Sequence, residues 1–115
     1  MTEGVSPVIK NTSGPAEMAL AQHLTDIGAK MYGAYWSPYC HQQKELFGKE
    51  AAQVIPYIEC GDDFQTAFCQ SILEPRGFPT WEIHGTFLAG LQSLETLANE
   101  SGYEGNTHFQ KAITP

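Results

Sequence analysis

Hydrophobic and polar positions divide this chain into alternating helices and strands. Apolar residues from Met18 to Ile27 recur at three- and four-residue spacing, which predicts an amphipathic helix. Residues 30–35 are instead almost continuously apolar or aromatic, as in a buried parallel strand. The full set of expected elements is a helix at 13–28, a strand at 30–35, a helix at 38–52, a strand at 54–59, a short helix at 64–72, a hairpin at 80–88 and a helix at 94–99. This order predicts an α/β fold whose parallel strands are joined by a right-handed crossover.

Short polar residues and glycines mark the expected ends of these helices. Serine and aspartate side chains can accept a hydrogen bond from the N–H groups of a first helical turn. The N-cap candidates are Ser13, Ser37, Asp63 and Ser93. Pro15 and Pro38 suit the turns that follow the first two of them. Gly28 ends the first helix, and Gly48 kinks or interrupts the second.

The composition predicts one domain with two loose ends. The chain has 115 residues, of which 42% are hydrophobic and 17% charged, which is ordinary for a globular domain and argues against disorder. Residues 1–12 are polar and show no period, and the chain after the last helix has the same character. We therefore expect a flexible N-terminal arm at 1–12, a domain at 13–103 and a C-terminal tail at 104–115.

Charge and hydropathy argue against nucleic-acid binding and against a membrane span within this sequence. The net charge is −7, and the 6 basic residues are scattered, so no patch could neutralise the phosphates of a nucleic acid. No apolar stretch approaches the roughly 18 residues of a membrane span, and no signal peptide is visible. If the natural protein works outside the cytosol, we expect this chain to be a piece of something longer.

The candidate chemistry lies in the motif Trp36-Ser37-Pro38-Tyr39-Cys40, at a junction of strand and helix. A redox site of the Cys-x-x-Cys type has this layout, with its first thiol at the helix N-terminus. The helix dipole favours the thiolate there, the thiolate attacks a disulfide, and the second thiol resolves the mixed disulfide. Ser37 occupies the first position, and its hydroxyl stays protonated near neutral pH without a strong base. The alternative is structural: Ser37 is only an N-cap, and Cys40 only a small buried residue.

The other two cysteines, Cys60 and Cys69, are nine residues apart across a turn and a short helix. We expect them to form a structural disulfide, which would stabilise the fold by roughly 3 kcal/mol through loop entropy and indicate an oxidising compartment. The alternatives are two buried free thiols and, as a third reading, a pair with a shuttle role. With Cys40 the count is three, and a cysteine at position 37 would make two pairs.

A second motif, Arg76-Gly77-Phe78-Pro79-Thr80-Trp81, begins the expected hairpin. Together with the first motif it resembles the thioredoxin superfamily. This resemblance implies a three-layer α/β/α fold with a central mixed sheet, whose parallel strands are followed by an antiparallel hairpin. It also implies a cis Pro79 beside the Cys40 motif, with the backbone of Phe78 free to pair with a substrate strand. Trp36, Pro38, Tyr39, Phe78 and Pro79 would then form the substrate-binding surface; Trp81 fits this rim or the core equally well.

Several further stretches resemble one branch of that superfamily, the thioredoxin-like domain linked to vitamin K epoxide reductase homologues of cyanobacteria and plant plastids. They are Gly33-Ala34-Tyr35-Trp36, residues 41–48, Tyr57-Ile58-Glu59-Cys60, Gly77 to Ile83 and Gly90 to Leu94. In that family a membrane domain oxidises this domain, which passes the disulfide to client proteins. The resemblance implies a place in the periplasm or thylakoid lumen. It implies no bound cofactor, since any quinone would belong to the membrane domain. Cys40-His41 with Cys60 and Cys69 does not match the spacing of zinc ligands, so we expect no metal site. We expect a monomer.

Ser37 departs from that family, and its origin has two explanations. It is an engineered replacement or a natural loss, and the intact residues around it favour replacement. A thiol-disulfide oxidoreductase domain, inactive or trapping at Ser37, is the leading hypothesis. The alternative is a redox-silent thioredoxin-fold module that binds peptides through Trp36, Tyr39 and Phe78. We further expect His41 and Glu59 to be ordinary surface residues rather than groups that tune or relay protons to Cys40.

Overall fold

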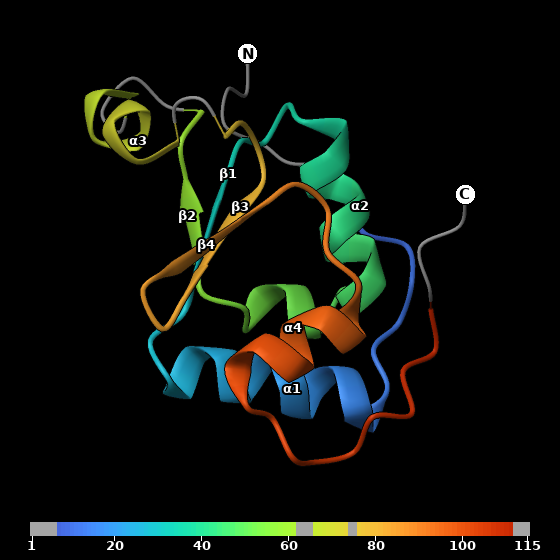
Figure 1. Ribbon diagram of the computed structural model, residues 1–115. Coiled ribbons are helices and arrows are strands. Elements are labelled where there is room, and N and C mark those ends of the chain that lie inside the picture. The colour runs from blue at the N-terminus through green and yellow to red at the C-terminus, as the bar shows by residue number, and fades with distance from the viewer. Residues whose placement is uncertain (1–6, 62–65, 74–75, 112–115) are drawn as a thin grey trace.

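The structure, a computed structural model, describes residues 7–61, 66–73 and 76–111. Its elements are, in order, α1 (Pro15–Asp26), β1 (Lys30–Gly33), α2 (Pro38–Phe47), the 3-10 helix η1 (Ala51–Gln53), β2 (Tyr57–Glu59), α3 (Thr66–Leu73), β3 (Thr80–Ile83), β4 (Thr86–Ala89) and α4 (Leu94–Ser101). The strands form one sheet in the order β2-β1-β3-β4 (Figure 1). β1 and β2 run parallel, and β1–β3 and β3–β4 are antiparallel. The predicted α/β fold with a mixed sheet is confirmed.

Side chains alternate between the two faces of this sheet, because successive residues of a strand point in opposite directions. On one face Trp81 of β3 pairs in register with Met31 of β1 and with Leu88 of β4. These three contribute to the main hydrophobic cluster. On the opposite face Tyr32 of β1 heads a smaller cluster that includes Cys60 and Cys69. The sheet therefore separates two cores of unequal size.

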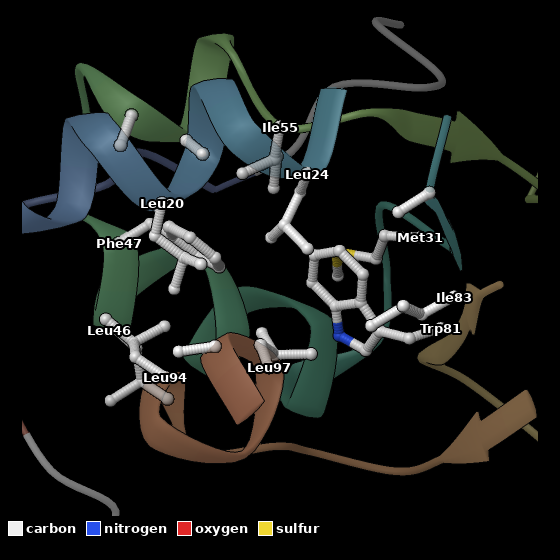
Figure 2. Packing of buried hydrophobic residues seen from close by; sticks show 14 of the residues in the cluster. Leu20, Leu24, Met31, Leu46, Phe47, Ile55, Trp81, Ile83, Leu94 and Leu97 are labelled. Carbon is white, nitrogen blue, oxygen red and sulfur yellow. The ribbon is translucent and has the colours of Figure 1, made fainter. Parts of the chain in front are cut away.

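The main core fills the space between the sheet and helices α1, α2 and α4. Figure 2 shows side chains from all three helices gathered with Trp81, and Figure 1 shows α3 apart from them at one end of the sheet. The labelled members are Leu20, Leu24, Met31, Leu46, Phe47, Ile55, Trp81, Ile83, Leu94 and Leu97. Removing this apolar surface from water provides most of the driving force for folding.

Several element boundaries differ from the sequence prediction: β2 spans only Tyr57–Glu59, and α4 continues to Ser101. Two helix boundaries differ for a clear structural reason. The N-cap of α1 is Gly14, whose backbone N–H donates to the Glu17 carboxylate at 3.0 Å. Ser13 lies one residue too early and is used elsewhere: its hydroxyl donates to the carbonyl of Phe47 and accepts from the N–H of Ala51, both at 2.8 Å. The prediction of Ser13 as N-cap was therefore wrong.

The second boundary is the end of α2, which stops at Phe47 rather than continuing to residue 52. Gly48 has φ +92°, outside the helical region, and its Cα lies so close to the neighbouring chain that a Cβ would meet the carbonyl carbon of Thr12 at 2.6 Å. A glycine suits both conditions. Ser37 and Ser93 cap α2 and α4 as predicted, and the Asp63 cap candidate lies outside the described residues.

Both chain ends, where described, are hydrogen-bonded to the helices. The N–H groups of Lys10 and Asn11 donate to the Glu45 carboxylate at 3.0 Å each. The N–H of Gln110 donates to the buried Glu17 carboxylate at 2.6 Å. Within the described ranges, no helix has the length and apolar character to cross a membrane.

Candidate redox site

Ser37 begins the site, as the N-cap of α2. Its N–H donates to the carbonyl of Ala34 at 3.0 Å, which closes the turn after β1. Its hydroxyl accepts from the N–H of Cys40 at 3.3 Å, and Pro38 takes the first helical position. The side chain is buried, so the hydroxyl serves the first turn of the helix rather than solvent.

Cys40 lies one turn into α2, with a free thiol that is only 2% exposed. The N–H of Ala34 points at its sulfur, with 3.5 Å between nitrogen and sulfur. Burial raises the pKa of the Cys40 thiol, and the hydrogen bonds from Ser37 and Ala34 and the charge of Lys44 only partly offset this. The thiol is therefore protonated and shielded near neutral pH.

A group of polar residues lies behind Cys40, and Gly33 leaves room for it. A Cβ on Gly33 would lie 2.7 Å from the Tyr57 ring and 3.0 Å from the Cys40 sulfur. The Lys44 ammonium lies 3.9 Å from the centre of the Tyr57 ring. Burial lowers the pKa of Lys44, and the charges of Glu59 and Cys40 act in the opposite direction. The thiol thus has a partly buried cation in its surroundings.

Glu59 completes this group at the end of β2. Its carboxylate accepts hydrogen bonds from the N–H of Tyr35 at 3.0 Å, the N–H of Gly61 at 2.7 Å and the hydroxyl of Tyr57 at 2.7 Å. The side chain is half-buried, and its charge raises the pKa of Cys40. The expectation of an ordinary surface residue was therefore wrong, because the backbone N–H groups of Tyr35 and Gly61 converge on the carboxylate.

The four aromatic residues of the two motifs differ in exposure: two are exposed, one is half-buried and one is fully buried. Trp36 and Tyr39 are 59% and 58% exposed. The Trp36 ring meets the half-buried Phe78 ring edge-on, with 5.5 Å between centroids, so the structure brings the two motifs together. The Phe78–Pro79 peptide bond is cis. Trp81 is fully buried and belongs to the core, not to an exposed rim.

The expected disulfide between Cys60 and Cys69 is present, which rules out the alternative of two free thiols. The two Cα atoms are 5.8 Å apart, a usual separation for this bond. Cys60 follows β2 directly, and its N–H donates to the carbonyl of Gly33. The bond therefore attaches α3 to the edge of the sheet, close in sequence to Glu59 and Gly61.

An open groove with a volume of about 420 Å³ lies beside Ser37. Its walls come from the N-terminal segment and from the start of α2: Pro7, Tyr35, Trp36, Ser37, Pro38, His41 and Gln42. His41 is half-buried, and its Nε2 lies 3.2 Å from the Glu45 carboxylate. His41 is thus held by α2 itself and faces the groove, not the buried thiol environment that Lys44 and Glu59 shape.

One structural residue near the site escaped the sequence analysis. Gln43 is fully buried, and its side-chain oxygen accepts from the Trp81 indole N–H at 3.1 Å and from the N–H of Gln92 at 2.9 Å. Its side-chain nitrogen donates to the carbonyl of Gln92 at 2.9 Å. The sequence did carry a signal, since Gln43 shares a helix face with Leu46 and Phe47 at spacings of three and four. Gln43 fixes α2, and hence the motif, against β3 and the loop after β4.

Comparison with known proteins agrees with this geometry. The chain is 43% identical over 102 residues to thiol-disulfide oxidoreductase LTO1 of Arabidopsis thaliana. The match covers 83% of this chain and 27% of the relative, so the chain spans about a quarter of the relative's length. No protein-family model matches the chain.

Proposed function

Because the chain belongs to the family of vitamin K epoxide reductase-linked thiol-disulfide oxidoreductases that includes LTO1, we propose that its site is built for disulfide exchange with client proteins. The observation that carries the proposal is the placement of Ser37 and Cys40. Ser37 is the N-cap of α2, and Cys40 lies one turn further with a buried, free thiol. This is the arrangement that a two-thiol exchange site requires.

In the proposed reaction, positions 37 and 40 carry a disulfide that oxidises a client dithiol. A client thiolate attacks the sulfur at position 37, forming a mixed disulfide and releasing the Cys40 thiolate. The second client thiolate then attacks the client sulfur of this mixed disulfide. The client leaves with a new disulfide, and the two electrons remain on the thiols at positions 37 and 40. The first turn of α2 stabilises the thiolate that leaves at position 37.

With serine at position 37 this chain lacks the sulfur that the client attacks. The hydroxyl accepts a hydrogen bond from the Cys40 N–H, and within the described residues no hydrogen bond joins it to a basic side chain. Cys40 is too shielded and too weakly acidic to replace it efficiently. We therefore propose that this chain is inactive in turnover, and that it forms mixed disulfides through Cys40 only slowly.

The proposed partners are client proteins that carry thiols or disulfides, together with a membrane-embedded epoxide-reductase-type domain that reoxidises the site. The relative is much longer than this chain, which leaves room for such a domain in it. The Cys60–Cys69 disulfide supports an oxidising compartment, either periplasm or thylakoid lumen. In the proposed reaction, cysteines are the only redox-active groups that this domain contributes.

The test is oxidation of a dithiol peptide by this chain and by its Ser37→Cys variant, both treated with an oxidant beforehand. We expect the variant to convert one equivalent of peptide to its disulfide, and this chain to convert less than about one hundredth as fast, since removing a group that reacts directly typically costs orders of magnitude. The control is the double variant Ser37→Cys/Cys40→Ser, which has no second thiol with which to form the 37–40 disulfide and should oxidise the peptide no faster than this chain does. A Ser37→Cys variant without activity would overturn the proposal.

A second candidate function is a redox-silent peptide-binding module. The exposed Trp36 and Tyr39 beside Phe78 favour it, because large aromatic side chains without cover often mark binding surfaces. Peptide binding by this chain together with inactivity of the Ser37→Cys variant would place this function first.

A further inference from the structure

We propose that the groove beside Ser37 binds the apolar side chain next to the reacting cysteine of a client peptide, with the N-terminal segment as one wall. Glu45 is the positioning residue that holds this wall in place. The inference rests on the proposed function, since it names the kind of client that the same site accepts.

The chemistry of the groove selects an apolar side chain. Pro7, Tyr35, Trp36 and Pro38 contribute rings to its walls, and its polar groups are few. Its volume of about 420 Å³ lies in the range of roughly 300–1,000 Å³ that is typical of binding sites for small ligands. A charged client side chain would lose water here and would find no carboxylate or ammonium group in the lining.

The position of the groove identifies its occupant as a client peptide. Ser37, where the client sulfur would be bonded, is itself part of the lining. An extended chain advances about 3.3–3.6 Å per residue, so the neighbour of a cysteine bonded at this position is within reach of the groove. Trp36 lies in the groove wall and also contacts Phe78 of the second motif, which makes the groove continuous with the proposed client surface.

The N-terminal wall depends on one carboxylate. Both oxygens of Glu45 accept backbone hydrogen bonds, from the N–H groups of Lys10 and Asn11, and the Asn11 amide donates to the Glu45 carbonyl at 3.1 Å. One of these oxygens also lies 3.2 Å from His41 Nε2, so the same side chain orients a second part of the lining. Hydrogen bonds to an ionised carboxylate are stronger than those between neutral groups.

Binding is tested on this chain with two peptides that lack a thiol and differ at one position, leucine or serine. The reporter is the change in tryptophan fluorescence on binding. This change comes from the exposed Trp36, because the fully buried Trp81 does not contact the peptide. We expect the leucine peptide to bind about tenfold more tightly, in line with burial of one apolar side chain. The Glu45→Gln variant should reduce this preference to about twofold or less. Its control is Glu100→Gln, which removes an exposed carboxylate of α4 and should keep the preference.

Measurements of turnover test the groove assignment separately from the proposed redox function. In the Ser37→Cys background, the corresponding dithiol peptides should differ in KM and not in kcat, and Glu45→Gln should raise KM for the leucine peptide alone. A general loss of structure would instead lower kcat for both peptides. The exposed Pro7→Gly variant, which cannot disrupt the core, provides a second test of the wall and should also weaken the preference.

Equal binding and equal KM for the two peptides would overturn the inference. If Ser37→Cys is then active on both, the proposed function stands and only the groove assignment fails. A preference for leucine in binding, combined with an inactive Ser37→Cys variant, would support the groove as a peptide site and overturn the redox function.

Discussion

The two faces of the sheet are stabilised in different ways. The face toward α1, α2 and α4 carries the main cluster, whose members come from every layer on that side. On the opposite face, the described residues form a smaller cluster of Tyr32, Cys60 and Cys69, against which partly buried residues pack. The first face is stabilised by the amount of apolar surface it buries, and the second depends on a covalent bond that attaches α3.

The candidate site lies where the two faces meet. Cys40 belongs to the main cluster, whereas Cys60 belongs to the smaller one. Phe78 packs against both clusters and also contacts Trp36 at the surface. The main core therefore positions both the motif helix and, through Trp81, the second motif, whereas Cys69 of α3 belongs to the smaller cluster. This comparison teaches that Cys40 and the motif helix depend on the main core, whereas the attachment of α3 depends on the disulfide.

Matched phenylalanine truncations would show the largest difference between the faces. Phe47→Ala leaves a cavity in the main core and should lower the free energy of unfolding by about 3–5 kcal/mol. Phe68→Ala removes a ring on α3 that is 50% exposed and should cost about 1 kcal/mol or less. Urea denaturation of both variants measures the difference. Equal losses would contradict the distinction between the faces.

Removal of the disulfide comes next in size. The double variant Cys60→Ala/Cys69→Ala should lose about 3 kcal/mol of stability, because the unfolded chain regains the freedom of the closed loop. Amide hydrogen exchange should then accelerate in α3 and stay slow in α1, since only α3 depends on the bond. The control Cys40→Ala removes a buried thiol outside the disulfide. Uniform acceleration across both helices would mean that the two faces do not unfold separately.

The smallest expected effects concern the pKa of the thiol of Cys40, which is a member of the main cluster. Its pKa is raised by burial, so its thiolate should form only at a pH above the range of an ordinary thiol. Glu59→Gln removes a negative charge and should shift the titration to lower pH, whereas Lys44→Met removes a positive charge and should shift it to higher pH. The ¹³Cβ chemical shift of Cys40 reports this titration without a reagent that must enter the core. Shifts of the same sign in both variants would contradict the electrostatic explanation.

Local features of the fold could be predicted from the sequence. The turn residues His84 and Gly85 lie where the hairpin was expected, and β3 and β4 flank them. Ser37 caps α2 because an N-cap interaction involves residues only three positions apart. The disulfide also joins residues close in sequence, at a separation of 9. Each of these interactions lies within a short segment, so the residue types of that segment are enough to predict it.

Contacts between distant segments could not be predicted in the same way. Ser13 has the composition of an N-cap, yet its hydroxyl bonds to Phe47 and Ala51, which lie 34 and 38 positions away. Gln43 is a polar residue that only the fold pairs with Trp81. Glu59 is half-buried where the backbone N–H of Tyr35, 24 positions away, meets its carboxylate. In each case the partner is chosen by packing, which the local sequence does not encode.

The sequence by itself determined the chemistry available at the motif: a serine and a cysteine spaced by one helical turn, a proline-containing second motif, and two further cysteines. The tertiary structure alone decided how accessible each group is. It buried the Cys40 thiol, exposed Trp36 and Tyr39, and placed the N-terminal segment beside the motif through Glu45. The physical reason is that residue type sets reactivity and local geometry, whereas burial and grooves arise only when segments far apart in the chain exclude water between them.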